Sequence, residues 1–128
     1  MIMNYLYLVA ISDLNRILLY QFSDKHKEYA GEWSLPFGVT TAEPSAAELK
    51  KCISTLFNCQ LKDSKLMETK SDDQGNKHYF FEAEVSSDVE LNDKKSDYGY
   101  YTFQQLHYFN LPKIQKELLG SVFASSNN

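Results

Sequence analysis

Arginine is almost absent from this chain. Of its 13 Lys and Arg residues only Arg16 is an arginine, and the formal net charge is −4. Arginine supplies the planar fork that holds a phosphate group by two hydrogen bonds. A surface that binds nucleic acid also shows clustered basic side chains, whereas the only adjacent lysines are at positions 50–51 and 94–95. The sequence therefore predicts no nucleic-acid partner.

Cysteine is equally scarce. Cys52 and Cys59 are the only two, and along a helix their spacing would place them about 10 Å apart. That distance is too long for a disulfide while the helix is intact. We therefore expect two reduced thiols, as in an intracellular protein.

Long apolar runs are missing as well. No stretch approaches the roughly 18 apolar residues that a membrane-spanning helix needs. The N-terminus also lacks the basic region, apolar run and cleavage site of a signal peptide. These features predict a cytoplasmic protein with no membrane partner.

Glycine and proline are few, at 5 and 3 of 128 residues, while 43% of the residues are hydrophobic. This composition argues against wholesale disorder. The length suits one domain that buries its own core. We expect a single domain over residues 1–128, with its core at about 3–122 and a tail at 123–128.

Apolar patterning predicts a chain of strands with two helices. Strands are expected at residues 5–11 and 16–22, which form an antiparallel hairpin, and then at 33–35, 60–69, 77–85 and 100–103. Residues 86–96 are predicted to form a polar loop. A last helix is expected to open at Thr102 or at Leu111 and Pro112, with Ile114, Leu118 and Val122 on its apolar face.

The best-defined element is a helix that follows residue 45. Ser45 and Glu48 match a capping box, in which the serine caps the helix and the glutamate returns a hydrogen bond. Asn58 is expected to end the helix in the left-handed conformation. The apolar residues that recur at i, i+3, i+4 and i+7, and so predict a face that packs on a sheet, are Leu49, Cys52, Ile53 and Leu56.

Residues 33–59, WSLPFGVTTAEPSAAELKKCISTLFNC, resemble the Nudix box. They contain a Trp-x-Leu-Pro-x-Gly turn, a short connection to the acidic Glu43, and then the amphipathic helix. Residues 101–106 are similar to a late Trp-x-x-x-x-Glu-Leu segment of the same family. The resemblance implies an α+β fold, a Nudix-like α/β/α sandwich with a mixed β-sheet flanked by helices. It also implies a pyrophosphohydrolase that uses magnesium to cleave a nucleoside diphosphate linked to another moiety.

The box helix of that family carries Arg-Glu-(apolar)-x-Glu-Glu-x-Gly-(apolar), and its glutamates hold magnesium. The matching positions here are Lys51, Cys52, Ile53, Ser54, Thr55, Leu56, Phe57, Asn58 and Cys59. Cys52, Thr55 and Leu56 thus replace all three glutamates. Magnesium requires hard oxygen ligands, whereas a thiol is soft and leucine offers no ligand. The sequence predicts no competent magnesium-dependent hydrolase and no cofactor.

An alternative is a divergent hydrolase that takes its magnesium ligands from other elements. Glu43 matches the acidic residue before the box helix, and Asp97 lies near the place of a catalytic base in some relatives. Together with Glu48 and Glu82, these carboxylates would have to converge within about 5 Å of one point. Otherwise they are solvated acids, with Glu43 near the helix N-terminus and paired with Lys51.

Other side chains indicate packing or binding. Cys52 could be a nucleophile, but its place on the apolar stripe favours a buried, inert thiol. Trp33 is expected to anchor the core. The aromatic residues of positions 98–109 exceed what one terminal helix can bury, so some are expected to line a ligand cleft or a dimer contact. We favour a Nudix-fold protein that binds a nucleotide-like small molecule or a protein partner, including a second copy in a homodimer.

Overall fold

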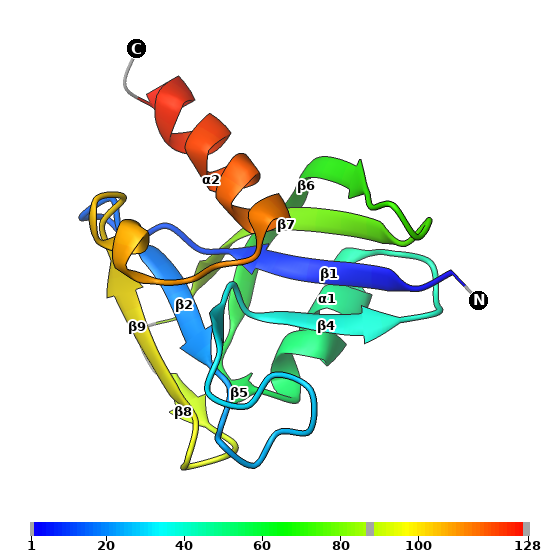
Figure 1. The fold of residues 1–128 in the computed structure, drawn as a ribbon, viewed down its shortest axis with the longest axis horizontal. Coiled ribbons are helices and arrows are strands. Elements are labelled where there is room, and N and C mark those ends of the chain that lie inside the picture. Colours follow the sequence, from blue (N-terminus) through cyan, green and yellow to red (C-terminus); the bar gives the residue numbers. More distant parts are fainter. Residues whose placement is uncertain (1, 87–88, 127–128) are drawn as a thin grey trace.

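The chain folds into short and long strands with two α-helices (Figure 1). The computed structural model describes residues 2–86 and 89–126, without the side chains of 124–126. The strands are β1 (Asn4–Val9), β2 (Ile17–Gln21), β3 (Trp33–Ser34), β4 (Phe37–Thr40), β5 (Phe57–Asn58), β6 (Leu61–Ser71), β7 (Lys77–Val85), β8 (Glu90–Leu91) and β9 (Asp97–Tyr101). The helices are α1 (Ala46–Ser54), the short 3-10 helix η1 (Gln105–Tyr108) and α2 (Lys113–Ser126).

A mixed sheet forms the centre of the molecule. Its four strands follow the order β4-β1-β7-β6, and a second sheet has the order β3-β2-β9. Strands β1 and β7 are parallel, whereas β1–β4 and β6–β7 are antiparallel. In the view of Figure 1, α2 lies above β1 and α1 lies below it. The predicted arrangement, a mixed sheet flanked by helices, is confirmed.

The predicted antiparallel hairpin of the first two strands is wrong, because these strands meet only next to the turn that joins them. Strand β1 pairs with β4 and β7, whereas β2 pairs with β3 and β9. Ile11 and Ile17 form a bridge next to the turn, in which Asn15 has a φ of 61°. Residues 6–10 and 17–20 are at most 4% exposed. Because both faces of each strand are buried, the two strands separate and each gains partners in its own sheet.

Strand β4 is an addition to the predicted elements, since Pro36 and Gly38 suggested a break in the chain. Pro36 instead stands just before the strand, where its carbonyl oxygen accepts a hydrogen bond from Leu8 N at 2.9 Å. Strand β8 likewise falls within the predicted loop of residues 86–96, of which 87–88 lie outside the described part. It pairs with β5, and this pairing joins two segments far apart in the sequence.

The C-terminal helix differs from the prediction at its end and on its buried face. Leu111 and Pro112 precede α2, while Thr102 lies three residues before η1, and its Oγ1 accepts a hydrogen bond from Gln105 N at 3.3 Å. Helix α2 reaches Ser126, so residues 123–126 do not form the predicted tail. Its buried residues are Gln115, Leu118, Leu119 and Phe123, whereas Ile114 and Val122 are half-buried. None of the described helices has the length and apolar character to cross a membrane.

Candidate functional site

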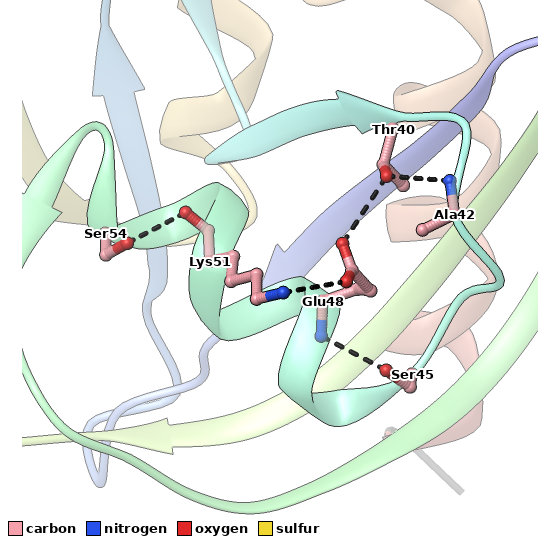
Figure 2. A network of polar contacts seen from close by, with 6 residues as sticks. All are labelled: Thr40, Ala42, Ser45, Glu48, Lys51 and Ser54. Carbon is pink, nitrogen blue, oxygen red and sulfur yellow. Dashed lines mark hydrogen bonds and ion pairs between the residues drawn. The ribbon is translucent and has the colours of Figure 1, made fainter.

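Ser45 and Glu48 fix the first turn of α1 (Figure 2). Ser45 Oγ accepts a hydrogen bond from Glu48 N at 3.1 Å, which confirms Ser45 as the N-cap. The Glu48 carboxylate does not return to Ser45. Its Oε2 accepts from the Thr40 hydroxyl at 3.4 Å, and its Oε1 lies 3.3 Å from Lys51 Nζ. The predicted pair of Glu43 and Lys51 is wrong, because Lys51 pairs with Glu48 and Glu43 is exposed. Only half of the predicted capping box forms.

Helix α1 ends at Ser54, before the box pattern is complete. Thr55 is the C-cap, with a φ of −75°, and its hydroxyl donates to the Cys52 carbonyl oxygen at 2.7 Å. The same carbonyl oxygen also accepts from Thr55 N at 3.3 Å, so two groups of Thr55 close the end of the helix. Asn58 lies in strand β5 instead of taking the predicted left-handed conformation. Pairing with β8 extends the chain here, so the last box positions are not on the helix.

The three residues predicted to replace the box glutamates do not form a polar face. Cys52 and Leu56 are 8% and 9% exposed, and both belong to the core. A Cβ atom placed on Gly38 would lie 2.5 Å from Cys52 Cβ, so the helix presses directly on β4. Burial, followed by the nearby Glu48 charge, raises the pKa of the Cys52 thiol. These contacts favour a buried neutral thiol over a nucleophile.

These residues do not fit a magnesium ion. Magnesium takes an octahedron of hard oxygen ligands, and the three positions offer one hydroxyl, which already donates to a carbonyl. Among the described side chains, no group of three His, Cys, Asp or Glu is placed to hold a metal ion. Glu43 precedes α1 and Asp97 begins β9, while Glu82 of β7 lies 3.9 Å from Lys65 Nζ.

The aromatic residues near the C-terminus are partly used in packing. The Trp33 ring meets Tyr101 and Phe109 edge-on, at centroid distances of 5.7 and 5.1 Å, and it packs against the core as expected. Tyr108 is the exception, at 88% exposure. This cluster ties β3 to β9 and to the segment after η1.

A cleft of about 510 Å3 opens beside the box, where Gly38, Thr55 and Leu56 form one wall. Binding sites for small molecules commonly measure about 300–1,000 Å3. The opposite wall comes from β1 and from the loop between β2 and β3, which closes with Gly31 N donating to Phe22 O at 3.0 Å. Sequence reasoning identified the box wall and missed the second wall.

Packed rings make up much of the second wall. The rings of Phe22, Tyr29 and Phe37 lie 5.3–5.5 Å apart pairwise, and Tyr5 joins them at 6.2 Å from Phe37. Burial, then the neighbouring Tyr5 and Glu28, raises the pKa of Tyr29. The phenol is therefore neutral around pH 7 and can donate a hydrogen bond at the cleft.

A polar network centred on the buried His78 lies beside Tyr5. His78 Nδ1 lies 2.7 Å from the Tyr7 hydroxyl, and His78 Nε2 lies 2.9 Å from Asp72 Oδ2. The Tyr5 ring stacks on the His78 ring at 4.7 Å, with an interplanar angle of 11°. The hydrogen bond from His78 is the main cause that lowers the pKa of Asp72. Burial is the main cause that raises the pKa of Tyr7.

Several solved structures share this architecture. One, from a study of MutT from Aliivibrio salmonicida and Vibrio cholerae, is 12% identical over 98% of this chain and 99% of that chain, with a TM-score of 0.79. The chain has the Nudix fold. A MutT NUDIX hydrolase from Burkholderia pseudomallei with this Nudix fold is 17% identical over 94% of this chain and 97% of that chain, at a TM-score of 0.74.

The MutT protein from Methanosarcina mazei Go1 also has this Nudix fold, with 16% identity over 98% of this chain and 96% of that chain and a TM-score of 0.67. No protein-family model matches the sequence, and neither does any curated protein. At these identities the likeness concerns the fold. Within this fold, Thr55 and Leu56 line the cleft, while Cys52 packs against Gly38 of β4.

Proposed function

We propose that this Nudix-fold chain binds a nucleotide-like ligand in the cleft and does not hydrolyse it with magnesium. The observation that carries this proposal is the state of the box positions. Cys52 and Leu56 are buried in the core, and the Thr55 hydroxyl is bonded to the end of its own helix. A fold alone does not fix a function. The local chemistry of the site therefore favours a ligand-binding protein over a divergent hydrolase.

The opposite wall of the cleft supports ligand binding. Small-molecule sites combine apolar and aromatic walls with a few polar groups. Here Tyr5 and Phe37 supply rings, while His26 and Glu28 supply polar atoms. The volume of about 510 Å3 suits a molecule of nucleoside size.

Titration calorimetry with nucleosides and nucleoside diphosphates tests the proposal, with and without magnesium. We expect the affinity to be unaffected by magnesium and the ligand to be recovered intact. Tyr5→Leu should weaken binding, whereas the matched change Tyr108→Leu should not, because Tyr108 lies outside the cleft and is 88% exposed. Magnesium-dependent cleavage of a diphosphate would refute the proposal in favour of a divergent hydrolase. Its carboxylates, such as Glu43 and Asp97, would then have to move together.

A protein partner, including a second copy of the chain, is a second candidate. Tyr108 is exposed and directly follows His107, which lines a recess of about 170 Å3 together with Phe103, Leu106, Leu111, Lys116 and Leu119. An exposed aromatic residue beside an apolar recess is typical of the centre of an interface. Sedimentation of the chain and of Tyr108→Ser over a range of concentrations tests this candidate. A monomer in both cases argues against a homodimer.

A further inference from the structure

We propose that the cleft selects a nucleobase whose amino group lies beside a ring-nitrogen acceptor, as in cytosine and adenine, and that it takes the free base or nucleoside in preference to phosphorylated forms. This inference rests on the proposed function, because it names the chemistry of the ligand in the same cleft. Three features carry it: a supported aromatic ring, a polar loop with one donor and one charged acceptor, and the charge of the walls.

Tyr5 provides a stacking surface that is already in place. Its ring lies 4.7 Å from the His78 ring and nearly parallel to it. His78 is itself held by Asp72 and Tyr7 on its two nitrogen atoms. A ring that is ordered before binding loses little conformational freedom when a ligand arrives. Aromatic side chains bind bases by stacking, which requires only a flat partner.

The loop between β2 and β3 brings the polar groups. His26 Nδ1 accepts hydrogen bonds from the backbone N–H groups of Glu28 at 3.2 Å and of Tyr29 at 3.1 Å. The neutral imidazole that accepts at Nδ1 carries its hydrogen on Nε2, so the ring offers a donor there. An ionised glutamate only accepts. His26 and Glu28 both line the cleft, and together they match a base edge with an amino donor beside a ring-nitrogen acceptor.

The charge of the walls is unfavourable for phosphate. The ionisable acid on the cleft wall is Glu28, and among the described residues that line the cleft none is Lys or Arg. A diphosphate would place its negative charges near this carboxylate, and like charges at short range repel. The box positions supply no carboxylates that would bring a compensating magnesium ion. A ligand without phosphate avoids this repulsion.

Calorimetry on the full chain with matched ligands tests the inference. Cytidine should bind about tenfold more tightly than uridine, and adenosine than inosine, because a charge-assisted hydrogen bond is lost in the second member of each pair. Each nucleoside should also bind about tenfold more tightly than its own 5′-diphosphate.

Substitution of the acceptor provides the second arm. Glu28→Gln should abolish most of the preference for cytidine over uridine, and it should reduce the difference in affinity between a nucleoside and its diphosphate. Glu84→Gln, on an exposed position of β7 outside this cleft, should change neither preference. Equal or tighter binding of the diphosphates, or equal binding of cytidine and uridine, overturns the inference and leaves the proposed function standing. Failure of all nucleosides and diphosphates to bind overturns both.

Discussion

Replacement of Cys52 by glutamate should destabilise the protein rather than restore a metal ligand. Cys52 is 8% exposed, and its Cβ and Sγ lie 2.5 and 2.8 Å from the position that a Cβ on Gly38 would occupy. The longer side chain therefore has no free space toward β4. Its carboxylate would also be surrounded by core residues, without a cation to pair with among the described contacts of this position.

The neutral isostere separates the steric cost from the cost of the charge. Cys52→Gln should lower the free energy of unfolding by about 1–3 kcal/mol, the usual range for overpacking a core. Cys52→Glu should cost about 3–5 kcal/mol more at neutral pH, the range found for a buried charge without a partner. The total free energy of unfolding of a native domain is about 5–15 kcal/mol. The glutamine variant should thus stay folded, while the glutamate variant should retain little or no free energy of unfolding at neutral pH.

Urea unfolding of both variants as a function of pH provides the assay. Burial raises the pKa of the introduced carboxyl above its ordinary value of about 4.3. A raised carboxyl pKa means that stability is retained below the unfolded value and lost as the pH rises through the folded value. The gap between the two variants should therefore grow from about pH 4 to pH 8. Equal stabilities at pH 8, together with stabilisation by magnesium, would show that position 52 faces the cleft and refute the reasoning.

Other parts of the structure give three further predictions. Gly38→Ala should lower the free energy of unfolding by about 1–3 kcal/mol in urea, because its methyl group would lie 2.5 Å from a β-carbon of α1. Gln115→Leu should cost about 1–3 kcal/mol by leaving the buried N–H after β3 without its acceptor, whereas Lys116→Leu, on an exposed neighbour, should cost little. The hydrogen bond from His78 lowers the pKa of Asp72 from 3.8. The carboxylate therefore contributes to the stability of the fold above that pH, and this contribution is lost as the pH falls. Asp72→Asn should flatten acid unfolding in this range, and an unchanged acid profile would contradict the role of the pair.

Short sequence patterns were sufficient to predict the start and the buried face of helix α1. Ser45 is the N-cap, and the predicted apolar stripe from Leu49 to Leu56 is buried. Strand β7 also has its predicted bounds, residues 77–85. In each case the decisive contacts are close in sequence or follow from one regular period. The pairing of strands could not be predicted in the same way, because β1 takes partners from residues 37–40 and 77–82, and no local pattern encodes that choice.

The candidate site was predictable on one wall. The resemblance to the box predicts that Cys52, Thr55 and Leu56 stand at glutamate positions, since the motif fixes their spacing, and two of these residues line the cleft. Tyr5 and Phe22 belong to predicted apolar strands, and their sequence context does not separate a cleft residue from a core residue. His78 joins Asp72, six residues before it, and Tyr7, 71 residues before it. The second of these contacts exists only after β1 and β7 have paired.

The backbone of residues 52–58 bears on the predicted loss of the magnesium-binding glutamates. Carboxylates can share one face of a helix only while the helix continues through their positions. Here α1 ends at Ser54, and the chain then turns into β5, which β8 holds in place. Leu56 precedes β5, its N–H donates to the Ile53 carbonyl oxygen at 2.9 Å, and its side chain belongs to the core. Glutamates placed at 52 and 56 would therefore enter the core, and only one at 55 would be exposed.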